Sequence, residues 1–269
     1  MMKELKKAQK ILNKEVQLYF KKELQYRNLI IVRTISDIVK IVAISFVWLM
    51  ASKSTNNISQ GYIVTYYILA TFMGRLMSDY TVYQGPQDII SGNFSKFIVK
   101  PFNYLIEYLG VNIGFNSIRF ILSLPAFIFG IFLVGNYWVL EFNPYNIFVS
   151  LIAIILGFTI NFLLGNIFTL GAFFTKQMDG IRTFYFNIAS FFSGEYIPLI
   201  FMSFNMRFAS EILPFRYTLS FPMELLIGKI EDVDVERGFV ISIIWIVVLF
   251  VSYKLLYKKS LKKYEAEGI

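Results

Sequence analysis

Long apolar stretches separated by short polar links run along most of the chain. A helix needs about 20 mostly apolar residues to cross a bilayer, and several stretches approach that length. The pattern therefore predicts an all-α membrane protein with six transmembrane helices in a single domain, residues 1–269. The predicted spans are Leu29–Ala51, Gly61–Met77, Phe115–Gly135, Asn146–Phe174, a fifth that begins near Thr183, and Phe239–Tyr257.

Two details of these spans carry structural expectations. Residues Tyr104–Gly114 are either an interfacial segment or the start of a tilted third helix, and Pro125 is expected to kink that helix. Charged residues in the first two spans lie one helical turn apart, a spacing at which opposite charges can pair. The expected pairs are Arg33 with Asp37 and Arg75 with Asp79.

Residues 1–27 form a basic segment with a helical apolar stripe. Leu12, Val16, Phe20 and Leu24 recur every four residues, which places them on one face of a helix. A Lys-rich helix with one apolar face is typical of a segment that lies on an anionic membrane surface. We therefore predict an amphipathic interfacial helix; the alternative is a solvated helix that packs on a partner.

A compact polar segment, residues 80–101 (YTVYQGPQDIISGNFSKFIVKP), separates the second span from the third. Gly85-Pro86 and Ser91-Gly92 punctuate it, and the residues between them can form a short helical turn. A partly helical polar segment between membrane helices is a place where a soluble partner can push.

The fifth apolar stretch is interrupted early. Ser193-Gly194-Glu195 lies where a continuous helix would approach the middle of the membrane. Residues 201–230 then alternate apolar patches with Pro214, Pro222 and Gly228, so that neither half makes a clean span. Because broken backbone at membrane depth is tolerated only where protein or a water-filled cavity shields it, we predict an outer re-entrant helical hairpin between spans five and six.

Lysine and arginine gather on one side of these spans. If both termini are inside, the short outer links hold only Lys53, which is the positive-inside pattern. This predicts a multi-pass protein with both termini cytoplasmic and residues 80–101 inside the cell. The inner segments then hold the two terminal lysine clusters, Arg75, Lys96, Lys100, Lys176 and Arg182.

The composition excludes several classes of function. Of the residues, 56% are hydrophobic and 16% are charged, compared with about 25% charged in soluble domains. The chain has no Cys and no His, which removes disulfides, thiolate and imidazole metal sites, and Ser-His-Asp triads. The net charge of +8 does not indicate nucleic-acid binding, because the basic residues flank membrane spans.

The sequence contains no nucleotide-binding or catalytic motif. A G-x-x-x-x-G-K-[ST] loop is absent, and Gly228-Lys229-Ile230 does not match it. An intramembrane enzyme without His or Cys would need a carboxylate pair or a Ser-Lys dyad, and no apolar span holds a convincing one. We therefore expect no enzymatic activity, no cofactor and no metal in this chain.

Three parts of the chain carry a family resemblance. One is the amphipathic helix before the first span. Another is Asp88-Ile89-Ile90-Ser91-Gly92 followed by Phe97-Ile98-Val99-Lys100-Pro101, which is similar to the run I-x-x-G-x-(4)-L-x-K-P. The last is the series Ser193-Gly194, Ile197-Pro198-Leu199, Leu213-Pro214-Phe215-Arg216-Tyr217, Phe221-Pro222 and Leu226-Ile227-Gly228. In this order, and over nearly the full length, the chain resembles the permease subunits of type-2 ABC exporters (the ABC-2 superfamily), in particular a prokaryotic six-span branch.

The resemblance implies a core of two permeases in the prokaryotic plasma membrane, the second identical or homologous. It implies two copies of a cytosolic ABC ATPase, which hold ATP and Mg²⁺. In the family the segment after span two is the coupling helix, which docks in a groove of the ATPase. Asp88 would either cap or polarise this turn or form a salt bridge to the ATPase, and the Lys176–Arg182 turn would be a lesser contact. The main coupling contacts are assigned to Gln87, Asp88, Ile89, Ile90 and Gly92.

Residues near the interruption are candidates for a substrate path or an outer gate. Glu195 either touches substrate or is a structural carboxylate paired with a cation such as Arg119. The candidates are Phe191, Phe192, Glu195, Tyr196 and Tyr217.

The expected function is outward transport of an amphipathic substrate, such as a lipid, a lipid-linked glycan, a drug or a peptide, with ATP hydrolysed by partner subunits. One alternative is an ATP-independent channel, which would need rings of polar pore-lining residues. The other is a secondary transporter, for which the hydrophobic pattern shows no inverted repeat.

Overall fold

The computed structural model describes residues 2–25, 27–52, 59–98, 104–135, 138–140, 143–175, 177–228, 230 and 232–266. Helices make up all the regular secondary structure in these ranges, and no strand occurs in them. The all-α class expected from the sequence is therefore confirmed. Of the coupling motif, residues 99–101 lie outside the described residues, as do Lys53 and Lys176.

Eleven α-helices and two short 3₁₀ turns follow one another in the described residues. The 3₁₀ turns are Leu199–Phe201 and Arg216–Thr218. The α-helices are α1 (Met2–Gln25), α2 (Arg27–Ser52), α3 (Gln60–Leu76), α4 (Thr81–Ile90), α5 (Ser95–Ile98), α6 (Tyr104–Val134), α7 (Pro144–Gly171), α8 (Met178–Phe192), α9 (Phe204–Ile212), α10 (Ser220–Ile227) and α11 (Asp232–Ala266).

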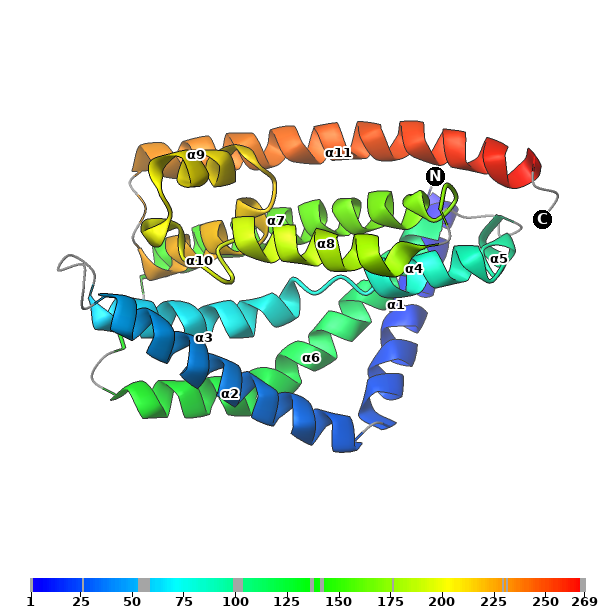
Figure 1. Ribbon diagram of the computed structural model, residues 1–269. Coiled ribbons are helices and arrows are strands. Elements are labelled where there is room, and N and C mark those ends of the chain that lie inside the picture. Colours follow the sequence, from blue (N-terminus) through cyan, green and yellow to red (C-terminus); the bar gives the residue numbers. More distant parts are fainter. Residues whose placement is uncertain are drawn as a thin grey trace.

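The long helices form an elongated bundle with distinct ends (Figure 1). Helices α3, α7, α8 and α11 run along the bundle, whereas α1 runs crosswise to them. The start of α1, the end of α11, α4 and α5 lie at one end, and α9 and α10 lie at the other. The segments predicted to be the coupling helix and the outer hairpin are thus at opposite ends of the bundle.

Three helices are long and apolar enough to cross a membrane, judged by length and composition over the described residues. Helices α3 and α8 have 17 and 15 residues and are shorter than a full span, and α2 carries charged residues in its first half. Six spans therefore stay a prediction. The three candidate spans are Tyr104–Phe132 in α6, Pro144–Gly171, which is α7, and Val233–Lys263 in α11.

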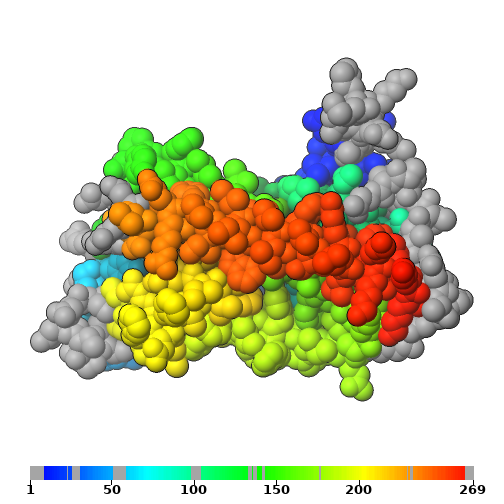
Figure 2. Space-filling view, turned by 90° about the horizontal axis from the view of Figure 1, so that it is seen from above, coloured from blue at the N-terminus to red at the C-terminus, as the bar shows by residue number. Residues whose placement is uncertain are grey.

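Helix α11 lies on the surface along the whole molecule (Figure 2). In the middle of the helix its exposed large side chains are branched and aromatic apolar residues, such as Ile243, Val247 and Val251. A helix with an apolar outer face is expected where lipid replaces water as the surrounding solvent.

The structure decides between the two interpretations of the segment before the third predicted span. Residues Tyr104–Gly114 belong to α6, which continues through Pro125, so they are the start of the helix and not a separate interfacial segment. Figure 1 shows α6 changing direction along its course.

Arg75 and Asp79 do not form the pair that the helical spacing predicts, while the expected Arg33–Asp37 pair stays a prediction. Asp37 of α2 accepts hydrogen bonds from Arg75 of α3. Asp79 lies beyond the end of α3, and its Oδ1 accepts hydrogen bonds from Thr81. The expected Arg75–Asp79 pair is therefore wrong, because Arg75 turns towards a neighbouring helix.

The region after the interruption consists of short pieces. Helices α9 and α10 have nine and eight residues, so residues 201–230 do not form one straight rod. An ion-pair network holds them together: the guanidinium of Arg216 lies 3.1 Å from Glu224 and 3.4 Å from Glu211. Whether this region re-enters the membrane stays a prediction.

Helix α1 packs closely against α6 through two glycines in a G-x-x-x-G spacing. A Cβ on Gly110 would lie 3.0 Å from the backbone oxygen of Leu12, and a Cβ on Gly114 would lie 2.7 Å from that of Val16. Small residues at this spacing let two helix backbones approach each other. The stripe predicted for the membrane surface therefore faces α6 at Leu12 and Val16, whereas Leu24 is exposed.

Replacing Gly114 with leucine should disrupt this contact. The side chain has no room beside the backbone of Val16, and overpacking of this kind costs roughly 1–3 kcal/mol. We expect a lower thermal unfolding midpoint for purified Gly114→Leu in detergent. Gly180→Leu is the control, because a Cβ on Gly180 meets nothing within 4 Å. An equal midpoint for both variants would mean that α1 is not held at this position.

Candidate functional site

The link between α3 and α4 is bonded to two long helices. We call residues 76–81 the elbow. The side-chain amide of Asn116, on α6, donates hydrogen bonds to the backbone oxygens of Leu76 (2.9 Å) and Ser78 (2.7 Å). Asn161, on α7, donates to the backbone oxygen of Met77. These bonds satisfy carbonyl groups that the end of α3 leaves without a helical partner.

The start of α4 is held in the same way. Oδ1 of Asn112, on α6, accepts a hydrogen bond from the backbone N–H of Tyr80 (2.8 Å), and its Nδ2 donates to the Thr81 hydroxyl (2.8 Å). The hydroxyl of Thr169, on α7, donates to the backbone oxygen of Thr81 (3.1 Å). The elbow is therefore fixed to α6 and α7 on both sides of the turn.

Asp79 is the buried acid of the elbow. Its Oδ1 accepts from the backbone N–H of Thr81 (2.8 Å), while Oδ2 points at α7, where a Cβ on Gly165 would overlap it. Oδ2 is buried without a hydrogen-bond partner among the described residues. Burial raises the pKa of Asp79 to about 7, although the hydrogen bonds from Thr81 lower it.

Two of the five predicted coupling residues anchor α4 to the bundle. Ile89 is 7% exposed and packs in a cluster with aromatic residues of α6 and the following turn, including Phe94 and Tyr104. The Asp88 carboxylate accepts hydrogen bonds from Tyr108 of α6 (2.7 Å) and Gln84 (2.9 Å). Asp88 therefore binds α6 and does not cap the turn.

The other three predicted residues lie at the surface or in the turn. Gln87 is exposed, Ile90 is 38% exposed, and Gly92 is partly buried. Gly92 has φ +74°, a conformation that favours glycine and that ends α4 with a sharp turn. The structure thus leaves Gln87 and Ile90 available for a partner.

The lesser predicted contact lies beside α4. The ring of Tyr83, which is 50% exposed, stacks on Phe186 of α8 with centroids 5.3 Å apart. The guanidinium of Arg182 lies 5.3 Å from the Tyr83 ring centroid and 2.5 Å from Asp179. Helix α4 and the first turn of α8 therefore form one continuous surface. The sequence interpretation did not include Tyr83 in this surface.

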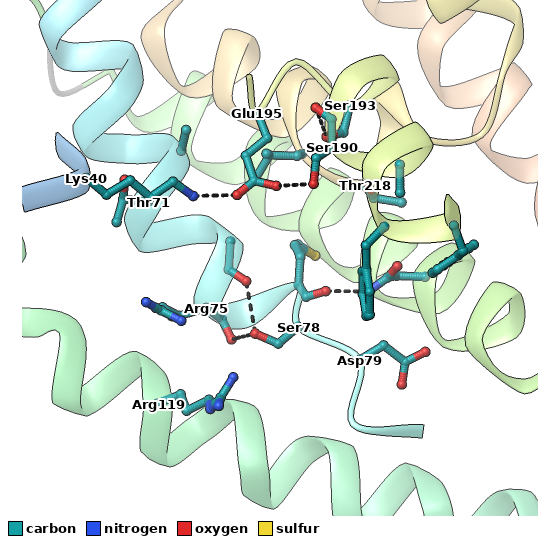
Figure 3. A pocket seen from close by; sticks show the side chains of 18 of the residues that line it. Lys40, Thr71, Arg75, Ser78, Asp79, Arg119, Ser190, Ser193, Glu195 and Thr218 are labelled. Carbon is teal, nitrogen blue, oxygen red and sulfur yellow. Dashed lines mark hydrogen bonds and ion pairs between the residues drawn. The ribbon is translucent and has the colours of Figure 1, made fainter. Parts of the chain in front are cut away.

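A cavity of about 260 Å³ connects the elbow with the interruption after α8 (Figure 3). Tyr83 of α4 and Asp79 line it together with Ser193 and Glu195 of the interruption. Its other polar and charged lining residues are Lys40, Thr71, Arg75, Ser78, Arg119, Asn161, Tyr185, Ser190 and Thr218.

An ion pair joins α2 to the interruption across this cavity. Nζ of Lys40 lies 2.5 Å from Oε1 of Glu195, and the hydroxyl of Ser190 donates to Oε2 (2.7 Å). Figure 3 shows this chain of contacts above Arg75 and Arg119. Of the two interpretations of Glu195, the pairing with a cation matches this contact, and the cation is Lys40 rather than Arg119. Contact of Glu195 with substrate stays a prediction.

The interruption itself is fastened to α2 and α3. Helix α8 ends at Phe192, and Gly194 has φ +84°. The Tyr66 hydroxyl donates to the backbone oxygen of Gly194 (2.8 Å). The Tyr67 hydroxyl and the Trp48 indole N–H donate to the backbone oxygen of Tyr196 (both 3.1 Å).

Of the five residues predicted for a substrate path or gate, only Glu195 lines the cavity. Phe191 and Phe192 contact each other edge to face with centroids 5.1 Å apart, and Tyr196 is exposed. Tyr217 is buried in the core between α7 and α10 and donates a hydrogen bond to the backbone oxygen of Glu211 (2.5 Å).

The sequence interpretation gave no role to the amides that hold the elbow or to Lys40. The signal was present, because Asn112, Asn116 and Asn161 are polar residues inside apolar stretches. Such residues turn towards the protein interior and bond to other helices. Which helix they meet is a matter of tertiary structure.

Comparison with known protein families assigns the chain. The family described as ABC-2 family transporter protein matches residues 38–268. A comparison with curated proteins gave no match. The matched residues include the elbow, α4, the cavity and the interruption. The chain therefore belongs to the ABC-2 family of transporter proteins and is a multi-pass membrane permease.

Proposed function

We propose that this chain is the membrane subunit of an ATP-driven exporter in the prokaryotic plasma membrane. Two copies of a cytosolic ABC ATPase supply the energy and hold ATP and Mg²⁺, and a second permease, identical or homologous, completes the membrane core. Both termini lie in the cytoplasm. The family match supports this proposal, as does the absence of a nucleotide-binding loop in the sequence.

The attachment of α4 is the observation that carries the proposal. One side of α4 is buried through Ile89 and bonded through Asp88 to α6, while Gln87 and Ile90 are exposed. A helix that is firmly held on one side and open on the other can transmit a push from a soluble partner. The neighbouring first turn of α8 enlarges the docking surface through Arg182.

The elbow connects a displacement of α4 to the long helices of the bundle. A displacement of α4 acts on α6 through Asn112 and Asn116 and on α7 through Asn161 and Thr169. Because these helices border the cavity, the displacement alters the cavity walls. Alternating exposure then follows as a shift between two arrangements of the bundle, with ATP binding favouring one of them.

The cavity is our candidate for the part of the substrate path that lies in one permease. It extends from α4 to the interruption, where Glu195 is one of the lining residues. The proposed substrate is an amphipathic lipid-like molecule, a drug or a peptide. No bond is made or broken by this chain in the proposed cycle.

A charge on the exposed side of α4 should break the contact with the ATPase. We expect Ile90→Glu to reduce co-purification of the ATPase and ATP hydrolysis by the complex roughly tenfold, the effect of about 1.4 kcal/mol on binding. Gln60→Glu, an exposed position at the start of α3, is the control and should retain both. The purified chain alone should hydrolyse no ATP. Normal ATPase recovery with Ile90→Glu, or conductance without ATP, would count against the proposal.

Removal of one elbow amide should separate ATP hydrolysis from transport. Asn116→Leu leaves two backbone oxygens of the elbow without the hydrogen bonds that Asn116 donates. Loss of about 1–3 kcal/mol of coupling free energy corresponds to a roughly 5–150-fold weaker coupling between the two sites. We expect the complex to assemble and hydrolyse ATP while substrate transported per ATP falls at least fivefold.

The matched control is Asn187→Leu, an exposed asparagine of α8. Both variants are compared at equal amounts of folded complex, determined by gel filtration. A parallel fall of hydrolysis and transport in Asn116→Leu would indicate a purely structural role for the amide.

A further inference from the structure

The cavity is lined by cations from three helices. Lys40 comes from α2, Arg75 from α3 and Arg119 from α6 (Figure 3). Ionisable side chains inside a membrane domain are costly and are usually retained for a partner or a pathway. The lining also has two acids, Glu195 and Asp79, so the positions of these acids decide the charge that a ligand would meet.

Asp79 does not face the two arginines. Its carboxylate is directed to α7, where Gly165 leaves room for it, and it accepts from Thr81. Figure 3 shows this carboxylate pointing away from Arg75 and Arg119. Asp37 pairs with Arg75 and is not among the residues that line the cavity, so the arginine side has two cations and one paired acid.

The two arginines can accommodate an additional acceptor. A guanidinium carries five N–H donors, and Asp37 uses donors on Nε and Nη2 of Arg75. The Arg119 guanidinium lies over the Phe115 ring, 4.0 Å from its centroid, which holds it at the cavity wall. Planar guanidinium groups match the oxygens of phosphate and carboxylate groups.

Glu195 is a replaceable partner of Lys40. The side chains of Lys40 and Glu195 are 34% and 27% exposed, and one contact of 2.5 Å joins them. Ion pairs that remain accessible to solvent contribute little stability. An anion that enters the cavity can therefore take Lys40 from Glu195 at small cost, and Glu195 keeps the hydrogen bond from Ser190.

The size of the cavity limits what can enter. Sites for whole drug-sized molecules are about 300–1,000 Å³, whereas this cavity has about 260 Å³. It suits the polar end of an amphipathic molecule, with the apolar part remaining outside in the bilayer.

We propose that this cavity binds an anionic group, phosphate or carboxylate, between Arg75, Arg119 and Lys40, and that the anion displaces Glu195 from Lys40. That the bound molecule is the exported substrate rests on the proposed function; the binding itself does not. Glu195 then acts as an internal competitor, which occupies Lys40 in the empty cavity.

The test is direct binding to the purified permease in nanodiscs of zwitterionic lipid, without ATPase. The probes are dihexanoyl phosphatidic acid, inorganic phosphate and uncharged dihexanoylglycerol, and dissociation constants are obtained by ligand titration. The phosphatidic acid should bind at least tenfold more tightly than the glycerol, the effect of a hydrogen bond to a charged group. Equal affinity for these two lipids would overturn the proposal.

Inorganic phosphate separates the two sources of the anion. Binding of phosphate with the same response to the variants below identifies a site for the free anion. Binding of the phosphatidic acid alone identifies a site for a headgroup on an apolar molecule. Both outcomes support an anion site.

Two variants should change the affinity in opposite directions. Lys40→Gln should weaken binding of the phosphatidic acid roughly tenfold, and Lys40→Arg should restore it. Glu195→Gln should strengthen binding, because the competitor loses its charge. Arg237→Gln, an exposed arginine of α11, should have no effect. Weaker or unchanged binding in folded Glu195→Gln would contradict the displacement.

This experiment is independent of the partner ATPase. If the permease binds no ATPase but shows the opposite effects of Lys40→Gln and Glu195→Gln, the anion site stands and the exporter proposal fails. If the ATPase assembles and drives transport but Glu195→Gln binds the anion no better, the exporter proposal stands and the proposed displacement of Glu195 by an anion fails.

Discussion

The need to satisfy backbone carbonyl groups where a helix stops inside an apolar bundle governs this structure. An uncompensated carbonyl in such surroundings costs several kcal/mol. At the end of α3 the chain resolves the problem with side-chain amides from other helices, Asn116 and Asn161. These bonds fix where α4 begins, and α4 in turn fixes which of its residues are exposed. The proposed docking surface, the elbow and the part of the cavity lined by Asp79 and Asn161 thus depend on the same few amides.

The same constraint acts at the other end of the bundle by different means. After α8 the backbone leaves the helical conformation at Gly194. Tyrosine hydroxyls from α3 donate hydrogen bonds to the carbonyl groups that are left without a helical partner. Tyrosine suits this position because its ring fills apolar space while its hydroxyl reaches a polar group. The interruption is therefore tied to the middle of α3, and the elbow follows the end of the same helix.

Local signals in the sequence gave much of the fold. Glycine and proline marked the interruption at Gly194 and the turn at Gly92, since both glycines adopt positive φ. Apolar length placed α7 and α11 nearly correctly, although α11 extends well beyond the predicted span at both ends. The start of α6 was ambiguous because its polar residues resemble an interfacial segment. In the folded chain Asn112 and Asn116 face the elbow.

The partners of charged residues were the least predictable feature. Helical spacing relates only residues three or four positions apart, whereas Lys40 and Glu195 are 155 positions apart and Asp37 and Arg75 are 38 apart. Asp88 looked like an exposed acid for the same reason, and its partner Tyr108 lies 20 positions further on. The expected helical turn between Gly85-Pro86 and Ser91-Gly92 is the last part of α4, which begins at Thr81 and continues through Pro86. The family resemblance could not tell which side of α4 would be buried.

The contact between α1 and the elbow has a consequence for the surrounding lipid. Tyr19 of α1 packs edge to face on Tyr80 with centroids 5.4 Å apart, and the exposed side of α1 carries Lys10, Lys14, Lys21 and Lys22. Acidic phospholipids attract such lysines, each by about 1 kcal/mol near the bilayer surface. In the proposed orientation, with α1 on the inner leaflet, motion of the elbow drags a helix that acidic headgroups hold, so the headgroup composition of the host membrane sets part of the resistance against which the elbow moves.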